Sequence, residues 1–393
     1  MNTPLAYLGE QLSAWRQAGT WQLLRVLESE SAPESRFDGR EVINLASNNY
    51  LGLTTHPKLR EAALEATRKY GVGSGAVRTI SGTMSIHMQL EERIARFKNV
   101  EASVVFQSGF AANAGTVAAI LGPEDHIISD ALNHASIIDG CRLSRAKIHV
   151  FPHKDVTAAD KILADLTAAP GHKLLVSDGV FSMDGDIAPL PGLVEIAERH
   201  GAILMVDDAH SSGVLGRAGR GTIDHFDLHG RVHIQVGTLS KAIGVLGGCV
   251  CGSRDLIDFL YARARPFLFS TSHPPAVAAS CLAAFDVLEN EPDLIGNLWS
   301  NTRYWKEALA ASGFDTGMSE TPITPIMVGE ARRAHEFSRG LFDEGLLATG
   351  IGFPTVPEGK ARVRTIVTAT HTRQQLDRAA DILRRVAKKM GIL

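Results

Sequence analysis

The chain has 393 residues and a formal net charge of −3, with 45% hydrophobic and 21% charged residues, a composition typical of a globular protein. The small net charge gives no electrostatic reason to expect nucleic acid binding, and no apolar run reaches the roughly 20 residues that span a bilayer. The first residues show no basic segment followed by an apolar one, so we expect a cytoplasmic protein without a membrane partner.

The first 45 residues predict a helix followed by a polar strand-turn-strand. Beyond them, short apolar strands are predicted at 102–107, 126–129, 147–151, 173–177, 202–206, 232–236 and 248–252. Amphipathic helices are predicted between strands at 110–121, 135–144, 157–168 and 190–200. Apolar strands that alternate with helices indicate an α/β fold, here a mostly parallel seven-stranded sheet sandwiched by helices.

The pattern changes after about residue 290. Helices at 301–311, 334–344 and 373–389 then alternate with strands at 323–328 and 362–368, which indicates a smaller α+β domain. The sequence therefore predicts an N-terminal arm over 1–45 that packs on the C-terminal part, a large domain over 46–290 and a small domain over 291–393.

Polar residues follow the ends of several predicted strands, where ligands bind in an open parallel sheet. Ser108, Gly109 and Phe110 lead from a strand into a helix, and the N–H groups of a helix start favour a phosphate. His134 follows the next strand, where its ring could stack on an aromatic cofactor. An ordinary turn at Ser108 and a helix-capping role for Asn133 are the alternatives at these two places.

Two further strand ends carry charged residues. Asp207 follows the strand 202–206, and a carboxylate there loses hydration unless a partner such as a protonated pyridine nitrogen or an arginine meets it. Lys241 follows the strand 232–236, and a lysine amine held away from water becomes a nucleophile able to form a Schiff base. A phosphate site, a stacking histidine, an acid and such a lysine are together what pyridoxal phosphate (PLP) requires.

Nearly the whole chain resembles the α-oxoamine synthase family of fold-type I PLP-dependent transferases. The resemblance is carried by SNNYLGL at 47–53, GSGAVR at 73–78, NHAS at 133–136, VDDAH at 206–210 and GTLSK at 237–241. It implies PLP as the cofactor, an amino acid and an acyl-CoA as substrates, and a homodimer whose active site is shared between subunits.

The resemblance also implies catalytic roles. Lys241 forms the Schiff base and moves the proton at the substrate Cα, Asp207 pairs with the ring nitrogen, and His134 stacks on the ring. His210 and Ser182 border the phenolic oxygen of the cofactor. The remaining implied contacts are Ser108, Gly109, Phe110 and Thr238 at the phosphate, Ser270 and Thr271 at the phosphate of the neighbouring subunit, and Asn48 and Arg364 at the substrate carboxylate.

The substrates are expected to be glycine and acetyl-CoA, giving 2-amino-3-oxobutanoate and CoA. The alternative is the decarboxylating condensation of L-alanine with pimeloyl-CoA, the 8-amino-7-oxononanoate synthase step of biotin synthesis, or an enzyme that does both. Succinyl-CoA is disfavoured because Val77 stands where the family's 5-aminolevulinate synthases typically carry a Thr that helps to bind the succinyl carboxylate. An aminotransferase is a further alternative.

A non-catalytic partner subunit is the alternative from another functional class. Such subunits of the family characteristically lose the Schiff-base lysine, whereas this chain has both Lys241 and Asp207. No metal site is expected, because the four cysteines form no paired metal-binding pattern. Small apolar core positions in a reducing compartment are their expected role: Cys141, Cys249, Cys251 and Cys281.

Overall fold

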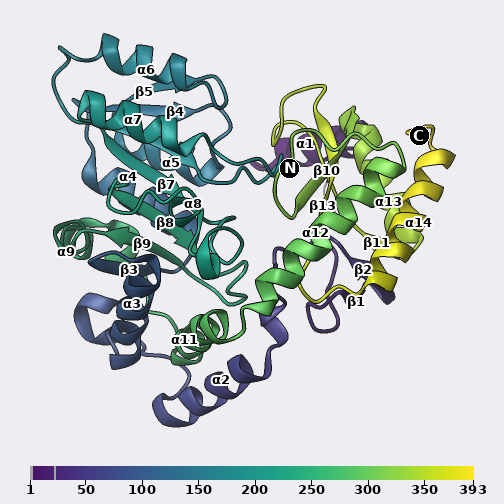
Figure 1. The fold of residues 1–393 in the computed structure, drawn as a ribbon, viewed down its shortest axis with the longest axis horizontal. Coiled ribbons are helices and arrows are strands. Elements are labelled where there is room, and N and C mark those ends of the chain that lie inside the picture. The colour runs from purple at the N-terminus through teal and green to yellow at the C-terminus, as the bar shows by residue number, and fades with distance from the viewer. Residues whose placement is uncertain (1–2, 22–23) are drawn as a thin grey trace. The chain divides into compact units, whose positions relative to one another are not determined.

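The protein is described here by a computed structural model covering residues 3–21 and 24–393 (Figure 1). It divides into two compact units. The large unit consists of Asn49–Ser182 and Asp186–Gly296. The small unit consists of Met1–Asn48, Met183–Gly185 and Asn297–Leu393, so that N-terminal, middle and C-terminal segments fold together.

The large unit is built on a seven-stranded sheet with the strand order β3-β9-β8-β7-β6-β4-β5 (Figure 1). The strands are β3 Ala102–Phe106, β4 His126–Asp130, β5 Lys147–Phe151, β6 Lys173–Asp178, β7 Ile203–Asp207, β8 Ile234–Thr238 and β9 Gly248–Gly252. Strands β4 to β8 pair in parallel, whereas β9 is antiparallel to both of its neighbours. The mostly parallel sheet predicted from the sequence is therefore confirmed.

Helices cover both faces of this sheet. They are α2 Pro57–Tyr70, α3 Ser85–Lys98, α4 Gly109–Ile120, α5 Ala135–Ser144, α6 Val156–Asp165, α7 Leu190–His200, α8 Thr222–His225, α9 Arg254–Arg263, α10 Arg265–Leu268 and α11 Pro275–Asn290. One apolar core joins α4, α5 and α9 to the sheet, and a second joins α6, α7 and α8 to it. Every residue of β3, β4, β8 and β9 is buried, because strands covered on both faces can be apolar throughout.

The small unit contains two three-stranded sheets, ordered β1-β2-β11 and β10-β13-β12. Its elements are α1 Ala6–Ala18, β1 Glu34–Phe37, β2 Arg40–Asn44, α12 Asp293–Ala311, β10 Ile323–Gly329, α13 Ala331–Asp343, β11 Leu346–Leu347, β12 Thr349–Ile351, β13 Ala361–Ile366 and α14 Arg373–Lys389. Helix α14 buries Leu376, Ala379, Leu383 and Val386, which recur at helical spacing, and β2 contributes Ile43 to the same core.

Strand β8 shows the most consequential difference from the sequence prediction. The apolar run predicted a strand over 232–236, but the strand continues through Gly237 to Thr238, which pairs with Gly248 of β9. Glycine is depleted in strands, so its presence concealed the true end. Lys241 consequently lies three residues beyond the strand. Six helices of the large unit as described here, α2, α3, α8, α9, α10 and α11, were not assigned from the sequence.

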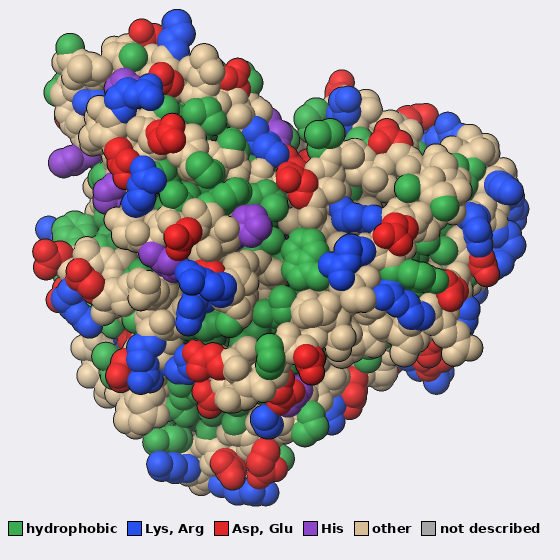
Figure 2. Space-filling view, viewed as in Figure 1, with side chains coloured by type: hydrophobic (Ala, Val, Ile, Leu, Met, Phe, Trp, Pro, Cys, Tyr) green, Lys and Arg blue, Asp and Glu red, His purple; other side chains and the backbone are tan. Residues whose placement is uncertain are grey.

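The surface and the cysteines agree with the composition. Figure 2 shows acidic and basic side chains intermingled on the visible face. All four cysteines are buried and form no disulfide bond. Within the described ranges, no helix combines the length and apolar character needed to cross a membrane. Nor do three or more His, Cys, Asp or Glu side chains within those ranges gather in a way that could hold a metal ion.

Candidate active site

The candidate site lies at the carboxyl edge of the large sheet. Strands β4, β6, β7 and β8 are parallel, so Asp130, Asp178, Asp207 and Thr238, which end them, share one edge. Asp178 and Asp207 are direct partners in the β6–β7 ladder. The residues that follow these strands in the sequence are thereby gathered in space, as expected for an open parallel sheet.

Asp207 is a buried carboxylate that is held by neutral donors. Asp207 is only 3% exposed. Asn113 donates from Nδ2 to its Oδ2 at 2.6 Å, and the backbone N–H of Ala209 donates to its Oδ1 at 2.8 Å. Across residues 3–21 and 24–393 no Lys or Arg forms an ion pair with it, which excludes the arginine partner considered from the sequence. A cationic ring nitrogen would meet an oriented, uncompensated negative charge.

His134 is connected to Asp207 through two side chains. Its Nδ1 lies 2.7 Å from Ser136 Oγ, and that oxygen accepts a hydrogen bond of 2.9 Å from Asn113 Nδ2. Burial lowers the pKa of His134; the charge of Asp207 opposes this shift and that of Lys241 adds to it. Burial therefore favours the neutral ring, and the hydrogen bond to Ser136 fixes its orientation, as stacking on a flat cofactor requires.

Asp178 differs from Asp207 although the two are neighbours. Burial, together with the charge of Asp207, raises the pKa of Asp178 well above its usual value, so its carboxyl group is held in the neutral form. Its Oδ2 accepts the backbone N–H of His134 at 2.8 Å. Burial and the repulsion between the two neighbouring carboxyl groups thus disfavour a second negative charge on Asp178.

The turn between β3 and α4 forms a candidate phosphate cradle. Ser108 caps α4 by accepting the Ala111 N–H at 3.1 Å, while the helix start leaves the N–H groups of Gly109 and Phe110 without intrahelical partners. A Cβ added to Gly109 would lie 3.3 Å from the Cβ of Thr238, so glycine permits the end of β8 to approach the helix. The hydroxyl of Thr238 is bonded to Gly247 O at 2.9 Å.

Lys241 lies in the turn between β8 and β9, and backbone hydrogen bonds across this turn fix its shape. Gly244 N–H donates to Lys241 O at 2.9 Å, and Leu239 N–H donates to Gly247 O at 2.9 Å. Gly244 has a φ of +76°, and a Cβ there would lie 2.9 Å from Thr54 N, so only glycine fits. The lysine is half-buried, which holds its amine at a defined place beyond the strand.

The other proposed cofactor residues are distributed around this edge. His210 is buried, and its Nδ1 lies 2.8 Å from the hydroxyl of Tyr50. Ser182 lies in the loop enclosed by the bridge between Val180 and Ile187. Thr271 is exposed and pairs with Val77, and Ser270 precedes it in a half-buried position.

Asn48 and Arg364 belong to the small unit. Arg364 lies in β13, opposite Thr349 of β12, and the segment after β2 runs beside this strand because Leu45 O accepts the Ile366 N–H at 2.8 Å. The Oδ1 atom of Asn48 is a buried oxygen that lacks a hydrogen-bond partner within the described ranges.

The neighbouring Arg362 already has its partners. It pairs with Asp184 and donates to Met183 O at 3.0 Å. Gly185 O is bonded in the same unit by the backbone N–H of Glu320 at 3.0 Å and the hydroxyl of Thr321 at 2.8 Å. Arg362 is thus bonded to residues of its own unit.

Sequence reasoning missed Asn113, Ser136, Tyr50 and Asp178 as parts of the site. Asn113 carried a readable signal, because it is a polar residue within the otherwise apolar helix GFAANAGTVAAI. Asp178 ends an apolar strand exactly as Asp207 does, but no local pattern distinguishes the carboxylate that is charged from the one that is neutral. That distinction depends on burial and on the pairing of β6 with β7.

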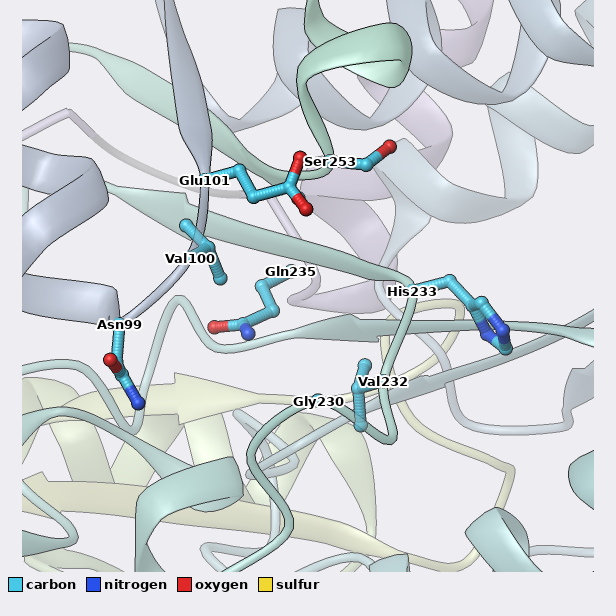
Figure 3. A pocket seen from close by; sticks show the side chains of 9 residues that line it. Asn99, Val100, Glu101, Gly230, Val232, His233, Gln235 and Ser253 are labelled. Carbon is cyan, nitrogen blue, oxygen red and sulfur yellow. The ribbon is translucent and has the colours of Figure 1, made fainter.

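A cavity lies elsewhere in the large unit. It has a volume of about 500 Å³ and is lined by residues that include Glu101, His233 and Gln235 (Figure 3). These residues lie at the start of β3 and of β8, so the cavity opens at the amino edge of the sheet. Its position separates it from the gathered strand ends.

The fold and the polar network fit a PLP-dependent enzyme of fold type I: one uncompensated carboxylate, a fixed imidazole, a glycine-dependent cradle and a lysine share an edge. The chain belongs to the family described as aminotransferase class I and II, which it matches over residues 40–383, and within it to the α-oxoamine synthases, the PLP-dependent C-acyltransferases that join an amino acid to an acyl-CoA. The predictions of the family, the cofactor and an enzymatic role are confirmed.

The relatives are similar over almost their whole length. The 8-amino-7-oxononanoate synthase of Symbiobacterium thermophilum is 58% identical over 98% of this chain and 99% of its own. The 8-amino-7-oxononanoate synthase 1 of Bacillus subtilis is 52% identical over 100% of both chains. Among solved structures, the serine palmitoyltransferase of S. paucimobilis with bound PLP-myriocin aldimine is 32% identical, covers 100% of both chains and has a TM-score of 0.94.

Proposed function

We propose that the enzyme condenses L-alanine with pimeloyl-CoA to give 8-amino-7-oxononanoate, CoA and carbon dioxide. The observation that carries this proposal is the name shared by the relatives at 58% and 52% identity, which match end to end. They favour this alternative over glycine and acetyl-CoA, the pair expected first from the sequence.

The site residues have separable tasks in this proposal. Bound PLP supplies an electron sink for the pair of electrons left on the substrate Cα. Lys241 anchors the cofactor and moves the proton at that carbon. Asp207, held by Asn113 and the Ala209 N–H, keeps a proton on the ring nitrogen, because its charge has no other cationic partner in the described part of the chain.

The phosphate and the ring are bound by different elements. The N–H groups of Gly109 and Phe110 bind the phosphate together with Ser108 and Thr238, and His134 stacks on the ring. His210 and Ser182 border the phenolic oxygen. Tyr50 supports this arrangement by fixing the Nδ1 side of His210 at 2.8 Å.

The substrate carboxylate is assigned to Arg364 and Asn48. A guanidinium group can grip a carboxylate through two parallel hydrogen bonds, and this fixes which Cα bond is aligned for cleavage. Ser270 and Thr271 are assigned to the phosphate of a neighbouring subunit, in a homodimer.

The test is a panel of acetyl-, succinyl- and pimeloyl-CoA crossed with glycine, L-alanine and L-serine. Release of the CoA thiol and of carbon dioxide is measured for each pair. We expect the highest kcat/KM with pimeloyl-CoA and L-alanine, and equal amounts of the two products. A higher kcat/KM with acetyl-CoA and glycine would overturn the proposal and restore the first expectation.

A further inference from the structure

His153 lies between two carboxylates that belong to different segments of the large unit. Its Nδ1 is 3.0 Å from Asp130 Oδ1, and its Nε2 is 3.0 Å from Asp186 Oδ2. A neutral imidazole has one donor and one acceptor nitrogen, so it would present a lone pair to one of these carboxylates. Only the doubly protonated ring donates to both, and this arrangement therefore requires the cation.

The two carboxylates organise segments that carry candidate cofactor contacts. Asp130 ends β4, and its Oδ1 also accepts the Leu132 N–H at 2.8 Å, which shapes the turn leading to His134. Asp186 closes the loop that contains Ser182, because its backbone oxygen accepts the Phe181 N–H at 3.1 Å.

Packing fixes the ring of His153 in this position. It meets the ring of Phe181 edge to face, with centroids 4.3 Å apart, and the histidine side chain is 26% exposed. The other charged group at this point is Lys154, whose Nζ lies 3.1 Å from Asp186 Oδ2 and whose backbone N–H donates to Asp130 Oδ2 at 2.8 Å.

We propose that His153 is a positioning residue: its cation ties the turn that carries His134 to the loop that carries Ser182, and thereby sets the spacing of two groups that contact opposite parts of the cofactor ring. This inference rests on the cofactor site of the proposed function but not on the choice of amino acid or acyl-CoA. Removing the cation leaves both carboxylates in place and leaves Lys154 as the residue that still bonds both of them, so the link between the two segments is weakened.

Because the inference requires the protonated form of His153, it predicts that the effect of this residue depends on pH. Burial acts to lower the pKa of His153, but the hydrogen bonds to Asp130 and Asp186 outweigh it and raise the pKa from 6.5 to about 9. Because the folded value is raised, the contribution of the cation is fully present below pH 6.5 and is lost as the pH rises through about 9.

The first test measures PLP binding to the apoprotein of the His153→Gln variant by absorbance titration, together with the Tm of apoprotein and holoprotein. We expect PLP affinity to fall by about tenfold at pH 7. The matched control is His200→Gln: His200 also bonds a carboxylate, Asp160, at 2.7 Å, but joins α7 to α6 away from the strand ends. It should change PLP affinity by less than about twofold.

The second test distinguishes positioning from general support of the fold. The effect of His153→Gln on PLP affinity should shrink at least about threefold in a Ser182→Ala background, because coupled residues are not additive. The ratio of wild-type to variant affinity should also approach one above pH 9. If His153→Gln does not fold, Asp186→Ala removes the acceptor of the same link, keeps the ring of His153, and should weaken PLP binding in the same direction.

Wild-type affinity in His153→Gln, a ratio independent of pH, or full additivity with Ser182→Ala would each overturn the inference. These results are distinguishable from failure of the proposed function. An enzyme that binds PLP normally but prefers other substrates refutes the substrate assignment alone, whereas a variant that binds PLP like wild type refutes the role of His153 alone.

Discussion

The two edges of the large sheet both carry polar side chains, but these side chains bond differently. At the amino edge, Glu101 accepts the Arg254 backbone N–H at 2.9 Å and His233 accepts that of Leu204 at 3.0 Å. At the carboxyl edge, the side chains of His134, Ser136, Asn113 and Asp207 bond one another in a continuous series.

The difference between the two edges shows that polar side chains serve two different purposes in this fold. Groups that satisfy backbone amides complete the fold, whereas side chains that orient one another build a preorganised site with a defined charge. The amino edge holds a cavity of about 500 Å³, yet its Glu101 and His233 accept hydrogen bonds from backbone N–H groups. The connected network, rather than the volume, identifies the site.

The largest expected effect at the carboxyl edge comes from Lys241→Ala. This change removes both the anchor of the cofactor and the group that moves the Cα proton, so CoA release should fall by about 10⁴-fold or more, and the visible absorbance of bound PLP should be lost. Lys161→Ala, at an exposed position of α6, is the control and should retain full activity. Normal turnover by Lys241→Ala would refute the assignment.

Asp207→Asn should have the second largest effect. The variant keeps the shape of the side chain but removes the charge that holds a proton on the ring nitrogen, so kcat should fall by about a hundredfold to a thousandfold. Glu101→Gln makes the same chemical change at the amino edge and should leave kcat within about twofold of wild type. Equal losses in the two variants would break the comparison between the edges.

Asn113→Ala tests the network rather than a contact with the substrate. Asp207 loses its 2.6 Å donor, and a hydrogen bond to a charged group contributes about 1.5–3 kcal/mol, so kcat should fall by about tenfold. Asn290→Ala removes an exposed amide that bonds only the backbone of α11 and serves as the control. An unchanged kcat in Asn113→Ala would show that Asp207 needs no orientation.

Asp178→Asn sharpens the contrast within the site. Because Asp178 is already neutral, the amide should keep the acceptor for the His134 N–H, and kcat should stay within about threefold of wild type. The raised pKa makes wild-type stability fall as the pH rises above 3.8 toward the folded pKa. Urea unfolding should therefore show that the free energy of unfolding of the variant, relative to that of the wild type, increases as the pH rises. A hundredfold loss of kcat in the variant would instead mean that Asp178 acts as an anion.

Gln235→Leu at the amino edge should have the smallest effect on catalysis. Gln235 lines the cavity at the amino edge, away from the strand ends that carry the candidate site (Figure 3). Replacing its amide by an apolar group of similar size should change the free energy of unfolding by about 1 kcal/mol or less and leave kcat/KM unchanged. A marked loss of activity would extend the functional site to this edge.

Much of the fold could be predicted because most strands of the large sheet are rich in apolar residues and the helices between them are amphipathic. Strand β5 and helices α5, α7 and α14 have the bounds that the sequence predicts. Glycine concealed the end of β8, and the grouping of Met183–Gly185 with the small unit depends on tertiary hydrogen bonds that leave no local pattern.

The candidate site was readable at Asp207 and Lys241, because charged residues after buried strands require partners. The residues that support these two, such as Tyr50 and Asn113, could not be predicted from the sequence. Tyr50 meets His210 across 160 positions of sequence, and Asn113 meets Asp207 across 94. Such pairs follow from strand order and helix packing, which local residue patterns do not specify.

The inclusion of Met183–Gly185 in the small unit has a consequence for how this protein can be divided. Neither unit is one continuous piece of the gene, and a polypeptide that joined only residues 1–48 and 297–393 would lack the carboxylate of Asp184 and the carbonyl of Gly185. Arg362 and Thr321 would then be synthesised without their acceptors. Production of the small unit on its own would therefore require Met183–Gly185 to be supplied with the two terminal segments.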